Sequence, residues 1–129
     1  MMRRTVFFCL LISLCATISA QTFWLGADIS GTTEMEAWGV QLRNAKGEPR
    51  ENTALMRELG LNAVRLRVWV NPKNRFSGKD DVVRMALRAK DWGMAVMIDF
   101  HYSDWWADPG QQNIPEAWKS YSYQQMRRR

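Results

Sequence analysis

Hydrophobic and polar residues alternate in three short stretches of the chain, at 23–30, 62–70 and 95–102. Side chains two positions apart share a face of a β-strand, so this alternation predicts three strands that each have one apolar face. In the second stretch the apolar face consists of Val64, Leu66, Val68 and Val70, and the opposite face of Arg65, Arg67 and Trp69. In each stretch the apolar face suits covering helices, while the other face gathers charge toward the C-terminal end.

Helical patterns separate these strands. Residues 51–60 place Leu55 and Leu59 one turn apart, and Gly60 is suited to end the helix. After the third strand, the third helix of the chain is predicted to start near Pro115, because proline is favoured in the first turn.

Residues 77–93 predict a further helix between the second and third strands. Ser77 or Asp80 is expected to cap its start, and Gly93 to close it. Its apolar stripe is formed by Val82, Ala86 and Ala89.

Alternating strands and helices predict βαβ units and a parallel sheet, which places the chain in the α/β class. An open sheet with helices on both faces would need both faces apolar, whereas a (β/α)8 TIM barrel needs only its outer face covered. On the barrel interpretation, five charged or ionisable side chains converge at the C-terminal ends of the strands: Asp28, Arg65, Arg67, Asp99 and His101. The alternative is an ion-pair network that only sets the strand register.

Residues 1–20 contain two arginines, then an apolar run from Val6 to Leu14, and then mostly small residues that end at Ala20. This order is typical of a secretory signal peptide cleaved after Ala20, and the run is too short to span a bilayer comfortably. We therefore expect a protein that is secreted, periplasmic or at the cell surface. Lipid attachment at Cys15 is an alternative. Both cysteines of the chain lie in this segment, so residues 21–129 contain no disulfide.

The excess of basic residues is concentrated at the two ends of the chain. Of 18 Lys and Arg, two lie in the signal segment and three at 127–129, which leaves 13 against 13 acidic residues. The body is therefore neutral, so the charge does not indicate nucleic-acid binding, and no membrane contact is expected after signal cleavage.

Four segments, in this order and spacing, carry a family resemblance: "GADIS", "NAVRLRVWVNP", "RAKDWGMAVMIDFHYSDWWADPGQQ" and "IPEAW". From about residue 23 to 126, the chain resembles the N-terminal third of glycoside hydrolase family 53, the arabinogalactan endo-β-1,4-galactanases. Trp105 stands where that family more usually has threonine.

The resemblance implies that residues 21–129 form the N-terminal part of a (β/α)8 catalytic domain, about its first three βα units. It implies retaining hydrolysis of β-1,4-galactan, in pectin side chains or arabinogalactan, without a cofactor. Retention uses two carboxyl groups about 5 to 5.5 Å apart. The family carries these glutamates on its fourth and seventh strands, so we expect neither within residues 1–129, and we expect the chain to be inactive alone.

The resemblance also assigns supporting residues of the site. Arg65 matches an arginine that orients the nucleophile, beside Arg67 on the same strand face; His101 matches a histidine beside the cleaved bond, and Asp28 an acid near the cleft floor. Three residues match positions that line sugar subsites: Tyr102, Asp104 and Trp106. For Trp106 the alternative is a loop-anchoring role. Ordinary packing is the expectation for Trp24, Trp38, Trp92 and Trp118, and core filling for Met35, Met85, Met94 and Met97.

Two other functions remain open. Asp99 and His101 form an Asp-x-His pair at a strand end, as in some metal-dependent phosphoesterases, with Asp104 or Asp108 as further oxygen ligands. His101 is the only histidine of the chain, however, whereas such sites draw on several nitrogen ligands, so no metal site is expected. The other alternative is a non-catalytic galactan-binding or non-functional fragment.

Overall fold

The structure is a computed structural model that describes residues 23–128. The expected signal peptide and its Cys15 lie outside the described residues. In chain order the elements are β1 (Gly26–Asp28), α2 (Thr32–Ala37), α3 (Asn52–Glu58), β2 (Ala63–Val68), α4 (Lys79–Asp91), β3 (Ala95–Phe100), a 3-10 turn η2 (Glu116–Trp118) and α5 (Tyr123–Met126).

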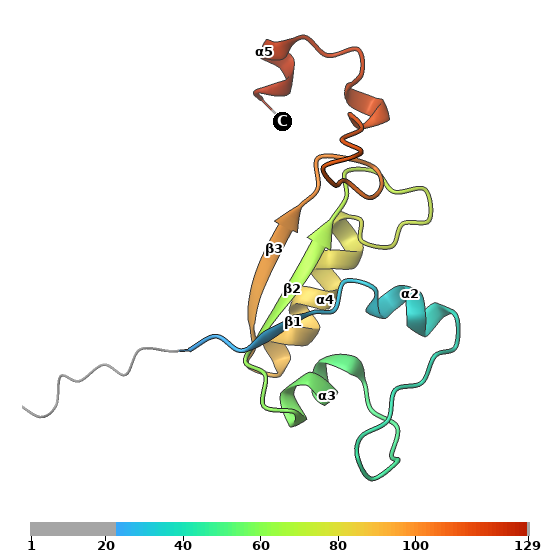
Figure 1. The fold of residues 1–129 in the computed structure, drawn as a ribbon, viewed down its shortest axis with the longest axis vertical. Helices are drawn as coiled ribbons and strands as arrows, with labels where there is room; N and C mark the ends of the chain where they lie inside the picture. The colour runs from blue at the N-terminus through green and yellow to red at the C-terminus, as the bar shows by residue number, and fades with distance from the viewer. Residues whose placement is uncertain (1–22, 129) are drawn as a thin grey trace, which may run out of the picture.

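The three strands form one parallel sheet in the order β1-β2-β3 (Figure 1). Asp28 is in register with Arg65, and Arg67 with Asp99. The C-terminal ends of the strands therefore meet at one edge, where the loops after β2 and β3 also lie (Figure 1). The predicted strands and their parallel arrangement are confirmed.

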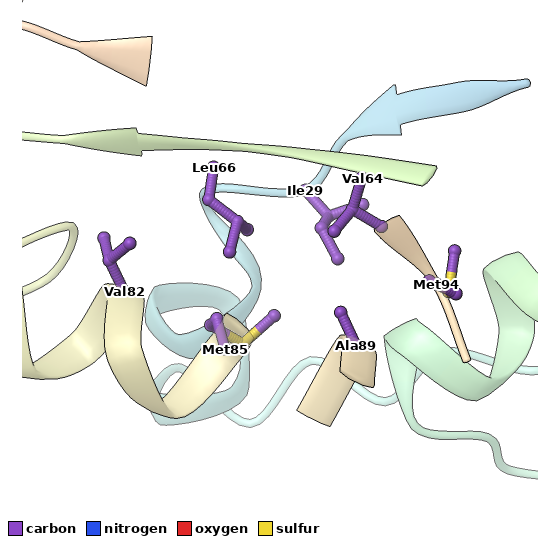
Figure 2. Close-up of a cluster of buried hydrophobic side chains, with 7 residues drawn as sticks. All are labelled: Ile29, Val64, Leu66, Val82, Met85, Ala89 and Met94. Atoms are coloured by element: carbon purple, nitrogen blue, oxygen red, sulfur yellow. The ribbon is translucent and has the colours of Figure 1, made fainter. Parts of the chain in front are cut away.

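The core lies between β2 and α4, which covers one face of the sheet (Figures 1 and 2). Val64 and Leu66 point from β2 toward Met85 and Ala89 of α4, and all four side chains are almost completely buried. The core cluster also includes Ile29, Val82 and Met94. The predicted stripe on α4 is confirmed, since Val82 and Ala89 are buried and Ala86 packs against the cluster.

The predicted start of α4 is wrong. Gly78 is the N-cap residue, and neither Ser77 nor Asp80 caps the helix. Instead the buried carboxylate of Asp81 accepts hydrogen bonds from the Ser77 backbone N–H (2.7 Å) and from the Thr33 hydroxyl (2.8 Å). A carboxylate inside the first turn thus fixes both the preceding loop and α2, and it suits the positive end of the helix dipole.

Helix α3 ends one residue earlier than its apolar spacing predicts. Leu59 is the C-cap residue and is exposed, so the expected Leu55–Leu59 stripe is wrong at its second position. The helix buries Asn52, Thr53 and Ala54 instead. Gly60 follows with a φ of +90°, a left-handed conformation that favours glycine, so its predicted role in closing the helix is confirmed.

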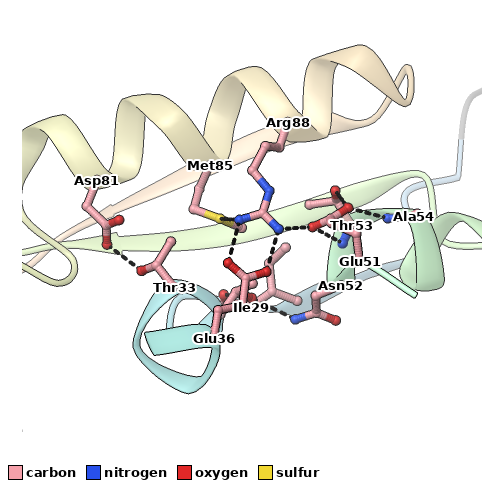
Figure 3. Close-up of polar contacts among 11 residues, drawn as sticks. Ile29, Thr33, Glu36, Glu51, Asn52, Thr53, Ala54, Asp81, Met85 and Arg88 are labelled. Carbon is pink, nitrogen blue, oxygen red and sulfur yellow. Dashed lines mark hydrogen bonds and ion pairs between the residues drawn. The ribbon is translucent and has the colours of Figure 1, made fainter. Parts of the chain in front are cut away.

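One arginine joins three helices on the outer side of the sheet (Figure 3). The Arg88 guanidinium on α4 donates to Glu36 of α2 at 2.6 and 3.0 Å and also contacts Glu51. Glu51 in turn caps α3 by accepting hydrogen bonds from the Thr53 and Ala54 N–H groups at 2.9 Å. Because the cap and the ion pairs share one carboxylate, the orientations of the three helices are coupled.

Two elements differ from expectation elsewhere. Residues 32–37 form α2, a short helix that the sequence pattern does not predict. No long helix starts at Pro115 within the described residues; this proline precedes a single 3-10 turn, and α5 begins only at Tyr123 with a capping box from Ser122. The expected third helix is therefore wrong at this position.

Several large apolar side chains that were expected to pack are exposed. Trp24, Trp38 and Trp92 are at least half exposed, and Met97 is 63% exposed, so these packing predictions are wrong for this structure. Met97 lies on the same face of the sheet as Arg65, its register partner, and α4 covers the opposite face. Met85 and Met94 are buried as expected.

Candidate functional site

Asp28 at the end of β1 and Arg65 on β2 form the first link of a charged group. The two residues are register partners, and the Arg65 guanidinium donates to Asp28 Oδ2 at 2.7 Å. Its second terminal nitrogen donates to Asp99 Oδ2 on β3. One arginine therefore joins all three strands through two carboxylates, in the fork geometry that a guanidinium provides.

His101 extends this group beyond β3. Its Nε2 lies 2.8 Å from the same Oδ2 atom of Asp99, and its side chain is mostly buried. The expected convergence is thus found for Asp28, Arg65, Asp99 and His101, at the C-terminal edge of the sheet. We refer to these four residues as the charged group. Arg65 remains partly open to solvent, so the group can meet a ligand.

Ser30 stabilises the ionised form of Asp28. Burial raises the pKa of Asp28. The Ser30 hydroxyl and N–H donate to Oδ1 at 2.6 and 2.9 Å and lower the pKa, as do the charges of Arg65 and Arg67, and these effects together outweigh burial. The net pKa lies below the ordinary range. Asp28 is therefore a fixed negative charge at neutral pH, which suits positioning of Arg65 and does not suit proton donation.

Arg67 occupies a different environment from Arg65. Its side chain is buried, and within residues 23–128 it forms no ion pair; one terminal nitrogen donates to the Ser77 hydroxyl at 3.2 Å. Its guanidinium carbon lies 4.2 Å from the Trp69 ring centre and 3.9 Å from that of Trp106. Burial lowers the pKa of Arg67, and the cation–π contacts offset part of its desolvation.

Asp104 holds loops together. Oδ1 accepts from the Asn71 N–H after β2, and Oδ2 from the Glu116 N–H at η2, both at 2.9 Å. Both carboxylate oxygens are engaged by backbone, which gives Asp104 an anchoring role beyond the subsite position that the resemblance implies. The Trp106 ring packs against Arg67, in line with the loop-anchoring alternative. It is also 45% exposed, and its subsite role stays a prediction.

Tyr102 is exposed and lies with His101 along a hollow of about 740 Å³ next to the end of β3. Asp99, Trp118 and the 107–115 loop also line this hollow. It therefore connects the charged group with aromatic side chains, an arrangement suited to sugars because rings pack on their apolar faces and polar groups meet their hydroxyls.

Two serines and a tryptophan were missed by sequence reasoning. Ser30 links Asp28 to the Arg67 backbone N–H (2.7 Å), Ser77 supports the Arg67 guanidinium, and Trp69 is the buried centre of the aromatic cluster. The only sequence signal was the position of Ser30 two residues after an aspartate, which favours such a side-chain turn.

Residues 23–128 contain no group of three or more His, Cys, Asp or Glu side chains placed to hold a metal ion. The phosphoesterase alternative thus gains no support from the arrangement of Asp99 and His101. In the same part of the chain, none of the helices has the length and hydropathy needed to cross a bilayer.

Three parallel strands with helices on one face and a polar group at the strand ends are the arrangement of the first units of a TIM barrel. Residues 24–129 match the profile of glycosyl hydrolase family 53. The chain belongs to this family.

Two relatives carry galactanase names. The chain is 39% identical over 121 residues to a probable arabinogalactan endo-β-1,4-galactanase A of Aspergillus fumigatus, covering 93% of this chain and 34% of the relative. It is 37% identical over 110 residues to an endo-β-1,4-galactanase of Bacillus subtilis, covering 79% of this chain and 26% of the relative. The chain thus spans about a third or less of the length of these relatives.

Solved structures agree with this assignment. A fungal β-1,4-galactanase matches with a TM-score of 0.74 and 40% identity, over 78% of this chain and 30% of that one. The family 53 catalytic domain of Ignisphaera aggregans matches with a TM-score of 0.76 and 33% identity, over 84% and 33%. The predicted fold class is confirmed: the three-stranded sheet corresponds to part of a TIM barrel.

Proposed function

We propose that this chain forms one wall of the substrate cleft of an exported endo-β-1,4-galactanase. The substrate is β-1,4-galactan, as in pectin side chains or arabinogalactan. The observation that carries the proposal is the charged group, in which Arg65 is held between Asp28 and Asp99 with His101 attached. The galactanase names of the relatives support the choice of substrate.

The proposed chemistry is hydrolysis with retention through a covalent glycosyl-enzyme. It needs an acid/base and a nucleophile about 5 to 5.5 Å apart. In this mechanism Arg65 positions the nucleophile, because its guanidinium is fixed by two carboxylates and partly open to solvent. His101 and Asp28 complete this wall of the cleft, and no step requires a cofactor.

Neither catalytic glutamate is assigned to a residue of this chain. Its six glutamates lie in helices, at a helix cap, in a 3-10 turn or in loops, and none lies in a strand: Glu34, Glu36, Glu48, Glu51, Glu58 and Glu116. We therefore propose that the 129-residue chain is inactive alone. A non-catalytic galactan-binding role remains the second candidate, favoured by the exposed rings of Trp105 and Trp106.

Export through residues 1–20, with cleavage after Ala20, is part of the proposal. N-terminal sequencing of the protein recovered from outside the cytoplasm tests it, and we expect the mature chain to begin at Gln21. An N-terminus at Met1, or a lipid-modified Cys15, would contradict this cleavage.

The decisive test compares two products of the gene on soluble β-1,4-galactan. One is the 129-residue chain; the other is the longest product obtained after sequencing past codon 129 and translating all three frames. We expect release of new reducing ends only by the longer product, and not from β-1,4-glucan. Hydrolysis by the 129-residue chain would place the catalytic groups inside it and overturn the proposal. If none of the three frames encodes a longer product, the galactan-binding role becomes the leading candidate function.

A further inference from the structure

Trp105 lies in the loop after β3, outside the charged group. Its ring stacks on that of Trp69, with ring centres 5.0 Å apart and planes inclined by 23°. Trp69 is 3% exposed, whereas Trp105 is 53% exposed. One face of the Trp105 ring is therefore covered by a buried aromatic ring, and much of the remaining surface faces solvent.

Trp69, the ring beneath Trp105, is itself packed against Arg67 and Trp106. The Arg67 guanidinium lies over the Trp69 ring and over the Trp106 ring, and Trp106 meets Trp69 edge-on at 5.6 Å. Trp106 also meets the His101 ring edge-on at 6.2 Å, so the aromatic cluster adjoins the charged group. A buried cation between two indoles favours one arrangement of these rings.

The backbone next to Trp105 is fixed as well. The Ser103 hydroxyl accepts from the Trp105 N–H at 3.3 Å, and the Ser103 carbonyl accepts from the Val70 N–H at 2.9 Å. Asp104 holds the same loop to Asn71 and Glu116. Little conformational freedom remains to be lost when a ligand packs on the ring, which favours binding.

We propose that Trp105 is a specificity-determining residue that stacks on a galactosyl ring of β-1,4-galactan. This inference rests on the proposed function and names one contact of that site. The axial 4-hydroxyl of galactose leaves the opposite ring face with a continuous row of C–H groups, which an indole face matches. The equatorial 4-hydroxyl of glucose does not produce the same face, so the contact distinguishes the two sugars.

Binding is measured by calorimetry with the full chain and two probes, β-1,4-galactotetraose and cellotetraose. The variants are Trp105→Ala and Trp105→Phe, with Trp38→Ala as the matched control, because Trp38 is exposed and lies in another part of the fold. We expect galactotetraose to bind about three- to tenfold more weakly to W105A, with binding rescued in W105F and unchanged in W38A.

The outcomes separate this inference from the proposed function. Equal galactotetraose affinity of the wild type and W105A would overturn the role of Trp105 and leave the galactanase proposal standing. A Trp105-dependent preference for cellotetraose would overturn the galactose assignment and also count against a galactanase. Absence of binding of both probes to the wild-type chain would overturn the inference, and the hydrolysis assay on the longer product would then decide the proposed function separately.

Discussion

Arg65 on β2 and His101, the residue that follows β3, meet at a single atom, Oδ2 of Asp99. Because a carboxylate oxygen of this kind accepts hydrogen bonds, we expect both partners to donate to it and the imidazole proton to reside on Nε2. His101 Nδ1 is buried and has no hydrogen-bond partner within residues 23–128. Asp99 therefore fixes the imidazole as well as the guanidinium.

Replacement of Asp99 by alanine is expected to free the imidazole. The chain has a single histidine, so its ring protons can be observed without overlap by nitrogen-edited NMR. We expect one exchange-protected imidazole proton on Nε2 in the wild type and its loss in Asp99→Ala. Asp91→Ala, an exposed site at the end of α4, should retain it. A protected proton on Nδ1 in the wild type would contradict the geometry.

The three strands, and the sheet edge at which their charged residues lie, could be predicted because the sequence patterns that indicate them are local. Alternation fixes which side chains share a face, and parallel pairing then brings Asp28, Arg65 and Asp99 to one edge. The register requires only that Val64 and Leu66 face α4. The sequence therefore predicted the four members of the charged group, but the fifth expected member, Arg67, is buried and donates to Ser77 outside this group.

Burial and loop chemistry were less predictable because they depend on distant partners. Leu59 fits a helical stripe but follows the last helical residue, and Trp38 has no neighbour in the described chain that covers it. The role of Asp104 depends on two backbone N–H groups, one 33 positions before it and one 12 after it. Nothing local in the sequence indicates such pairs.

The two faces of the sheet should respond differently to truncation. Leu66 is 1% exposed in the core, so Leu66→Ala should lower the free energy of unfolding by about 2 to 5 kcal/mol. Met97 is exposed on the Arg65 face, and Met97→Ala should change it by less than about 0.5 kcal/mol. Urea unfolding followed by circular dichroism measures both. An equal loss in Met97→Ala would show that this face is covered in solution, for example by self-association.

Removal of Arg88 should uncouple the three helices that it joins. Its guanidinium is mostly buried and contacts Glu36 and Glu51, so Arg88→Ala should cost about 1 to 2 kcal/mol. The matched control is Arg84→Ala on the same helix. The Arg84 side chain is 66% exposed, and its partner Asp81 keeps its hydrogen bonds from Ser77 and Thr33, so the loss should be less than about 0.5 kcal/mol.

Amide hydrogen exchange locates this effect. Faster exchange should appear first at Thr53 and Ala54, whose N–H groups bind the Glu51 carboxylate that Arg88 holds. Uniform acceleration across α4 and β2, without an excess at Thr53 and Ala54, would show that Arg88 acts only through packing of its own helix.

Stability should fall in acid through two identified carboxylates. Burial raises the pKa of Glu51, but hydrogen bonds from Thr53 and Ala54 and the charge of Arg88 outweigh it, so the net pKa is lowered. The pKa of Asp28 is also lowered. A lowered folded-state pKa means that the stabilisation is complete above the ordinary values, about 3.9 for Asp and 4.3 for Glu, and is lost as the pH falls below them.

Urea unfolding between pH 6 and pH 2.5 tests this assignment. We expect a decline below about pH 4 that is smaller in Glu51→Gln and in Asp28→Asn, and smallest in the double variant. Because the two sites lie in different parts of the fold and have different hydrogen-bond partners, their effects should add. Glu116→Gln, at an exposed carboxylate paired only with Lys119 through its side chain, should follow the wild-type curve. An undiminished decline in the double variant would show that the acid sensitivity does not come from Asp28 and Glu51.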